Sequence, residues 1–133
     1  MSAPVETTAH GSHPGFLSLV DEARARVRTF SIEEFVDRLT HGERFVLLDV
    51  REDLEWQAGH LPSAHHLGRG VIEREIETVL PDRATAIACY CSGDDRSVLV
   101  ADSLGRMGYT NVVVLDGGWH GWTERGLPTV TPA

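Results

Sequence analysis

The chain has 133 residues, of which 41% are hydrophobic, and it carries a formal net charge of −8. This length and composition predict one globular domain whose core needs neither disulfides nor a structural metal. The acidic balance argues against nucleic acid and anionic membrane as partners, because both bind clustered lysine and arginine. No apolar stretch approaches the roughly 20 residues that cross a bilayer. The first residues lack the features of a secretory signal, so we expect a cytoplasmic protein.

The first segment, residues 1–15, combines proline and glycine with threonine, serine and histidine, so we expect a flexible N-terminal arm. Apolar residues then recur with helical spacing, which predicts a helix over residues 16–29. Its apolar side is compatible with docking a partner or a second copy. A folded domain is expected over residues 30–129 and a C-terminal tail over residues 130–133. Three arginines of the helix form a strip that we expect to face solvent: Arg24, Arg26 and Arg28.

Helices and strands alternate along the rest of the chain. Ser31 and Glu34 have the spacing of a capping box, which predicts a helix that ends at Gly42. Short apolar runs predict strands at residues 45–49, 64–67, 85–90 and 112–115. Helical patterns predict the intervening helices at residues 52–58, 71–80, 95–107 and 119–125. This alternation predicts an α/β fold with a central parallel sheet of about five strands and helices on both faces.

Cys91 is the strongest candidate for chemistry, because it stands where an apolar strand passes into a tight loop and then a helix. The first N–H groups of a helix lack intrahelical partners, and the helix dipole places partial positive charge there. Both effects favour a thiolate. Arg96 adds a full positive charge, and Ser97 adds a hydroxyl donor. The alternative is a buried cysteine that acts as a small hydrophobe. The proposed chemistry requires a sulfur atom that solvent reaches.

Asp49, Cys89 and the histidines are the other candidates for this site. Asp49 ends its strand at the same edge of the sheet as Cys91, where open parallel sheets bind ligands. Cys89 lies too close to Cys91 for an unstrained disulfide and is expected in the core. Seven histidines show no metal-ligand spacing, so no metal is expected.

Together these residues resemble the rhodanese family, specifically the small single-domain rhodaneses of bacteria, over about residues 31–128. The likeness rests on four segments: residues 48–51 with Glu55, 59–64, 90–97 and 107–119. It implies a rhodanese-like domain at residues 30–129, in which the loop cysteine carries sulfane sulfur as a persulfide. It assigns the nucleophile to Cys91 and supporting roles to Asp49 and Arg51. The alternative for these two residues is a purely structural ion pair that ties the strand end to a neighbouring loop. The substrate cradle is expected at Ser92, Gly93, Asp94, Asp95, Arg96 and Ser97.

The resemblance predicts a sulfurtransferase that moves sulfane sulfur from thiosulfate or a persulfide to a thiol, cyanide or protein acceptor, without a cofactor. A noncatalytic rhodanese-like binding or regulatory module is the alternative. A phosphatase or arsenate reductase is disfavoured, because four residues separate Cys91 from Arg96 and the related phosphatases use a loop one residue longer. Both a monomer and a homodimer are compatible with the sequence.

Asp94 and Asp95 depart from the pattern of many thiosulfate-using members, which have neutral or basic residues there. Negative charges beside a thiolate raise the pKa of the thiol and repel anionic donors. One interpretation is therefore a donor that carries less charge than thiosulfate. In the other interpretation, both side chains point to solvent and Asp95 caps the helix through its side-chain oxygen.

Overall fold

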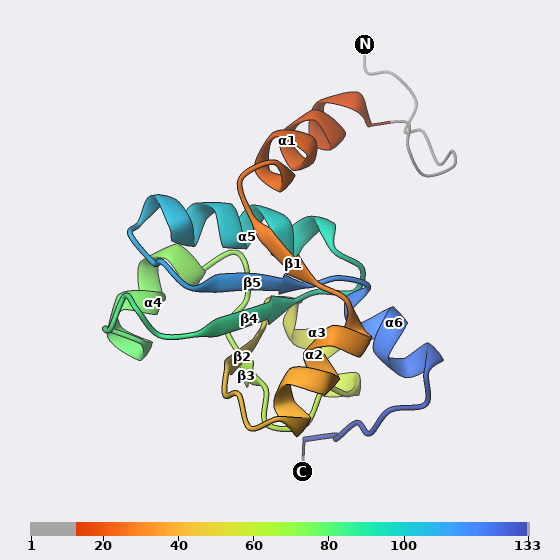
Figure 1. Cartoon of the computed structure of the whole chain (residues 1–133). Helices are drawn as coiled ribbons and strands as arrows, with labels where there is room; N and C mark the ends of the chain where they lie inside the picture. Colours follow the sequence, from red (N-terminus) through yellow and green to blue (C-terminus); the bar gives the residue numbers. More distant parts are fainter. Residues whose placement is uncertain (1–12, 133) are drawn as a thin grey trace.

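Five parallel strands form the central sheet of the structure, a computed structural model that describes residues 13–132 (Figure 1). Their order across the sheet is β1-β5-β4-β2-β3. The bounds are Arg28–Phe30 for β1, Val46–Asp49 for β2, His65–His66 for β3, Ile87–Tyr90 for β4 and Val112–Leu115 for β5. Because every pair is parallel, all carboxyl ends meet at one edge of the sheet. This edge is where open parallel sheets bind ligands.

Helices cover both faces of the sheet, which confirms the predicted α/β architecture (Figure 1). One face carries α1 (Pro14–Arg24), α4 (Ile72–Val79) and α5 (Asp95–Arg106), and the other carries α2 (Ile32–Thr40) and α6 (Gly118–Glu124). The short helix α3 (Asp53–Ala58) lies at the carboxyl edge, next to the loop that follows β4. None of these helices is long and apolar enough to span a bilayer, as far as residues 13–132 are concerned.

The central strand β4 supplies both hydrophobic cores. Its side chains alternate, so that Ile87 and Cys89 enter the core under α1, α4 and α5, whereas Ala88 and Tyr90 enter the core under α2 and α6. Every residue of β4 is buried. A strand that is buried on both faces has no polar side, which explains its continuous apolar run in the sequence.

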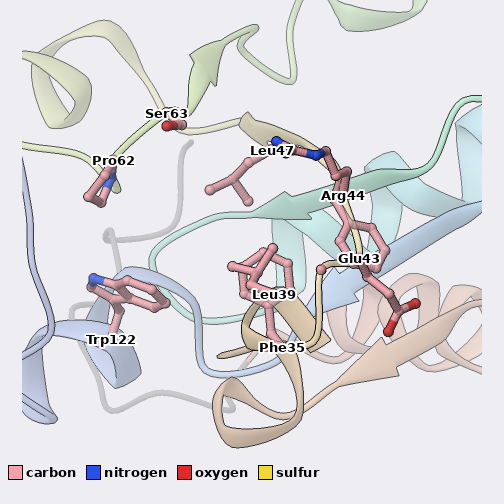
Figure 2. Close-up of a pocket in the computed structure, with 10 residues that line it drawn as sticks. Phe35, Leu39, Glu43, Arg44, Leu47, Pro62, Ser63 and Trp122 are labelled. Atoms are coloured by element: carbon pink, nitrogen blue, oxygen red, sulfur yellow. The ribbon is translucent and has the colours of Figure 1, made fainter. Parts of the chain in front are cut away.

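A cavity of about 470 Å³ lies on the side of α2 and α6 (Figure 2). Phe35, Leu39 and Trp122 supply apolar walls, and Glu43 and Arg44 lie at the turn that leads into β2. Its lining residues come from the stretches 35–47, 62–63 and 122, so the cavity is separate from the loop that follows Cys91.

The N-terminal region differs most from the prediction. The predicted helix at residues 16–29 is α1 at Pro14–Arg24, and residues 28–30 form strand β1, which the pattern did not reveal. Three residues with one buried side chain, Phe30, are too few to show alternation. A flexible arm was predicted over residues 1–15. Residues 1–12 of this arm lie outside the described residues, and its last two residues belong to α1. Within the predicted tail, Val130 exchanges two backbone hydrogen bonds with His60.

The capping role of Ser31 at the N-terminus of α2 is tested by substitution. Ser31 is the N-cap residue, and its hydroxyl accepts from the Glu34 N–H at 3.0 Å. Replacing Ser31→Ala leaves that N–H without its partner, so we expect a loss of about 1 kcal/mol in the free energy of unfolding. Urea denaturation at neutral pH measures it. Ser31→Asp, which also caps, is expected to retain most of the stability, and an unchanged stability in Ser31→Ala would contradict the capping role.

Candidate active site

Cys91 directly follows β4, the central strand, and its loop lies against the N-terminus of α6. The Trp119 N–H donates to the carbonyl oxygen of Cys91 at 2.8 Å, and the His120 N–H donates to that of Ser92 at 3.0 Å. These are first-turn N–H groups, which have no partner within their own helix. The start of α6 therefore fixes the first two residues of the loop.

Gly118 makes this close approach possible. Its φ is +53°, and a Cβ atom there would lie 2.3 Å from the carbonyl oxygen of Cys91 and 2.4 Å from that of Gly93. Any side chain would push the loop away, because real Cβ atoms do not approach carbonyl oxygens so closely. The sequence predicted a turn at Gly117 and Gly118. The packing role of Gly118 was missed, because no local pattern shows what it approaches.

The Cys91 sulfur has Ser97 as its polar neighbour. The two atoms Sγ and Oγ lie 3.4 Å apart, and the same hydroxyl is 2.9 Å from the carbonyl oxygen of Asp94. A hydroxyl has one hydrogen to donate. It therefore donates to Asp94 while Cys91 is a thiol, and it is placed to donate to the sulfur when Cys91 is a thiolate. The structure thus brings the predicted hydroxyl donor to the sulfur.

Cys91 is only 1% exposed and belongs to the core cluster that includes Val98 and Val100. The solvent-accessible sulfur that the sequence argument required is therefore not found, and this expectation was wrong for the arrangement described. Loop residues 92–96 are partly exposed. A donor reaches this atom only if the loop or the Cys91 side chain moves.

Glu55 of α3 binds two residues of the loop that follows β4. It accepts from Arg96 through both carboxylate oxygens, at 2.8 and 3.0 Å, and from the Ser92 hydroxyl at 2.7 Å. Arg96 also donates to Ser92 at 2.8 Å. The hydrogen bonds from Arg96 hold the pKa of Glu55 at about 2, and the same pairing raises the pKa of Arg96. Cys91 contributes to that rise through its charge and a hydrogen bond, so Arg96 acts on both the Glu55 carboxylate and the Cys91 sulfur.

The sequence assigned no role to Glu55, although the residue belongs to the segments that carry the resemblance. One signal was present, because Glu52 and Glu55 have the spacing of a capping box. The structure shows this box, in which the Glu52 N–H donates to Glu55 at 2.9 Å. Capping fixes the side chain of Glu55 on α3, but its bond to Arg96 spans 41 positions and is invisible to local patterns.

Asp94 and Asp95 face a cation from α1. The guanidinium of Arg24 lies 3.3 Å from the Asp94 carboxylate and 3.7 Å from that of Asp95. Asp94, and not Asp95, is the N-cap residue of α5, and its side chain makes no capping hydrogen bond. The alternative in which Asp95 caps the helix is therefore contradicted, and Arg24 is not simply a solvated charge. No capping side chain competes for the first N–H groups of α5.

Asp49 and Arg51 form a buried ion pair at the carboxyl end of β2. The Arg51 guanidinium donates to both carboxylate oxygens of Asp49, the shortest distance being 2.7 Å, and to the carbonyl oxygen of Gly59 at 2.6 Å. The Tyr90 hydroxyl donates to Asp49 at 2.6 Å, and Arg51 lies 4.6 Å from the ring centroid of Trp119. These contacts join β2, β4, α6 and the turn after α3, which is how a supporting pair would act.

Cys89 and His60 occupy structural positions. Cys89 is fully buried, and burial raises the pKa of its thiol well above the usual range. His60 stacks on Trp56 with the ring centroids 3.5 Å apart, and its Nδ1–H donates to the Leu61 carbonyl at 2.9 Å. Across residues 13–132, no group of three His, Cys, Asp or Glu side chains is placed to hold a metal ion.

A sequence model described as a rhodanese-like domain matches residues 31–125. The chain belongs to the rhodanese-like family. A sulfurtransferase of Allochromatium vinosum is 32% identical over 106 residues, which make up 80% of this chain and 97% of that relative. Several other curated relatives are longer, and the rhodanese-like chain spans 26% to 55% of their lengths. Family membership and sulfurtransferase relatives support sulfur transfer as the general chemistry.

Solved structures share the rhodanese-like fold at lower identity. One is a protein of unknown function and possible tyrosine phosphatase from Rhodopseudomonas palustris, with a TM-score of 0.80 and 22% identity over 98% of this chain and 100% of the other. Another is the polysulfide-sulfur transferase homodimer of Wolinella succinogenes, with a TM-score of 0.74 and 23% identity over 95% and 96% of the two chains. These matches confirm the predicted rhodanese-like fold.

The contact at Gly118 is tested against a second glycine with positive φ. Gly126 has a φ of +67°, and nothing lies within 4 Å of a Cβ atom placed there. We expect Gly126→Ala to lower the free energy of unfolding by about 1–2 kcal/mol, the cost of left-handed backbone alone. Gly118→Ala is expected to cost more and to change the rate at which iodoacetamide alkylates Cys91. Equal losses in both variants would contradict the contact.

The Asp49–Arg51 pair is tested by removing one partner. Asp49→Ala leaves the Arg51 charge buried without its carboxylate, and we expect a loss of about 3–5 kcal/mol in the free energy of unfolding. Adding Arg51→Met removes the unpaired charge and is expected to recover part of that loss. Urea denaturation of the two variants measures both effects. A loss well below 1 kcal/mol for Asp49→Ala would show that the pair is dispensable.

Proposed function

We propose that this rhodanese-like protein is a sulfurtransferase that carries sulfane sulfur on Cys91 as a persulfide. The donor is thiosulfate or a persulfide. The acceptor is cyanide, a small-molecule thiol or the thiol of a partner protein. One observation carries this proposal: the sulfur lies 3.4 Å from the Ser97 hydroxyl, at the uncapped N-terminus of the twelve-residue helix α5. An ionised sulfur is stabilised by such a hydroxyl, by loop N–H groups and by the helix dipole.

The reaction consists of two exchanges at sulfur. The Cys91 thiolate attacks the outer sulfur of thiosulfate, the S–S bond of the donor breaks, and sulfite leaves with the bonding electron pair. The outer sulfur now belongs to a Cys91 persulfide, whose negative charge the loop amides stabilise. An acceptor thiolate or cyanide then attacks this outer sulfur, the new S–S bond breaks, and the Cys91 thiolate is restored. No residue has to act as a proton carrier when donor and acceptor arrive as anions.

Loading requires a movement of the loop or of the Cys91 side chain, because Cys91 is 1% exposed. The hydrogen bonds among Ser92, Arg96 and Glu55 link the loop to α3 and are the contacts that an approaching donor would displace. All three side chains are partly exposed, so water replaces these bonds at modest cost. We therefore place the entrance at this cluster.

The burial of Cys91 also favours a second candidate, a noncatalytic rhodanese-like binding or regulatory module. A sulfur atom that never becomes accessible performs no exchange, and the residue would then serve only to pack the core. The acidic pair Asp94 and Asp95 agrees with this candidate too, because it repels anionic donors. The two functions are separated by whether Cys91 acquires sulfur.

The test uses each cysteine as the control for the other. The wild type, Cys91→Ala and Cys89→Ala are incubated with thiosulfate, glutathione persulfide or mercaptopyruvate, and the intact mass is measured without reductant. We expect one added sulfur atom in the wild type and Cys89→Ala and none in Cys91→Ala, with sulfite released from thiosulfate. Cyanide should then remove the sulfur as thiocyanate.

Other outcomes identify the alternatives. A folded wild type that gains no sulfur from any donor would support the noncatalytic module. Hydrolysis of an aryl phosphate that is lost in Cys91→Ala, without sulfur loading, would support a phosphatase. Sulfur found on Cys89 in place of Cys91 would contradict the assigned nucleophile.

A further inference from the structure

We propose that Arg24, the last residue of α1, is a specificity-determining residue of the Cys91 loop: it offsets the charge of Asp94 and Asp95 and so lets the loop accept anionic sulfur donors. This inference rests on the proposed function and adds a selection for charge. Arg24 lies before residues 31–125, the segment that the family model matches. The donor preference of this chain would therefore be set in part from outside that segment.

Helix α1 is firmly attached to α5, which places Arg24 reproducibly at the loop. Val20 and Ala23 are buried in the same core cluster as Val98 and Ala101 of α5. Just after α1, Arg26 donates to both carboxylate oxygens of Asp102 on α5, at 2.7 and 2.8 Å, an exposed pair that adds little to this apolar packing. Figure 1 shows α1 lying against the layer that contains α5. The position of Arg24 is therefore a consequence of helix packing and does not depend on its own ion pairs.

The loop has an excess of negative charge on the side that faces Arg24. Asp116, at the end of β5, joins Asp94 and Asp95 there: burial, followed by contact with Asp94, raises the pKa of Asp116. The same two causes raise the pKa of Asp95, with a smaller contribution from Asp21 of α1. The charge of Arg24 acts on both carboxyl groups in the opposite direction. Arg96 is committed to Glu55 on the other side of the loop. Arg24 is thus the counter-charge on the acidic side.

Thiosulfate brings two negative charges to this loop, whereas a neutral reagent brings none. Losing the charge of Arg24 should therefore penalise reagents in proportion to their negative charge. The ion pairs are partly exposed, with side-chain exposures of 39% for Arg24, 30% for Asp94 and 44% for Asp95. Solvent and salt screen such charges, which limits the expected effect to about three- to tenfold for thiosulfate.

The experiment compares Arg24→Gln with Arg26→Gln. Both variants lose one positive charge where the N-terminal segment meets α5, but Arg26 pairs with Asp102 and not with the loop. Cys91 is alkylated with iodoacetate, an anion, and with iodoacetamide, its neutral analogue, and kcat/KM for thiosulfate is measured in parallel. All variants carry Cys89→Ala, so that alkylation reports on Cys91 alone. We expect Arg24→Gln to lower the ratio of iodoacetate to iodoacetamide rates about two- to fivefold and kcat/KM about three- to tenfold. Arg26→Gln should change neither by more than about twofold.

A charge-restoring variant separates electrostatics from structure. Arg24→Gln combined with Asp95→Asn has the net charge of the wild type, so the rate ratio and kcat/KM should return toward wild-type values. A purely structural role for Arg24 predicts no such recovery, because the second change removes a partner without rebuilding any contact. High salt should also shrink the effect of Arg24→Gln.

The outcomes distinguish this inference from the proposed function. An unchanged ratio in Arg24→Gln with normal sulfur transfer, or an equal fall in the rates of both reagents, would overturn the role of Arg24 alone. A shifted ratio in a protein that never acquires sulfur would overturn the sulfurtransferase and leave charge selection at Cys91 standing. If Cys91 of the wild type reacts with neither reagent, both proposals fail.

Discussion

The geometry of the site depends on one close backbone approach, that of α6 to the loop after β4. Strands β4 and β5 are neighbours in the sheet, so the segments that leave their carboxyl ends emerge side by side. Gly118 lets them approach until the Trp119 N–H bonds the Cys91 carbonyl oxygen. With that oxygen held, the chain turns into α5 and brings Ser97 to the sulfur. The position of the candidate nucleophile thus follows from the order of the strands and the absence of a single Cβ atom.

Two ion-pair groups close the loop from opposite sides. Glu55 of α3 binds Arg96 and Ser92, and Arg24 of α1 binds the two acidic residues at the start of α5. Both groups tie the loop to a neighbouring helix through paired charges. Arg96 also acts on Cys91, and the Ser97 hydroxyl lies 3.4 Å from the sulfur.

The sequence predicted those parts of the structure that local patterns encode. Strand 112–115, the Ser31 cap and the start of α5 at Asp95 agree with the structure, because each is specified within a few neighbouring residues. Placing Ser97 near Cys91 required only the geometry of a helix start. Strand β1 was missed, because its three residues gain their β structure from pairing with β5.

The parts that could not be predicted are long-range contacts. Glu55, Gly118 and Arg24 are ordinary residues in their own segments, and their importance appears only when folding brings them to the loop. The exposure of Cys91 could not be predicted either, because the burial of a residue depends on which distant segments pack against it. A pattern of glycine and charged residues indicates a functional loop, but it does not show whether that loop is open or closed.

The folded unit is larger than the segment matched by the family model. Residues 31–125 contain four strands of the sheet, whereas β1 and α1 precede them. Strand β1 extends the sheet by pairing with β5, and α1 covers α5 with Val20 and Ala23. Both additions act on the half of the sheet that holds β4 and β5, and therefore on the side of the Cys91 loop that bears its acidic residues. The packing of this N-terminal segment thus places Arg24 beside the acidic residues of the loop.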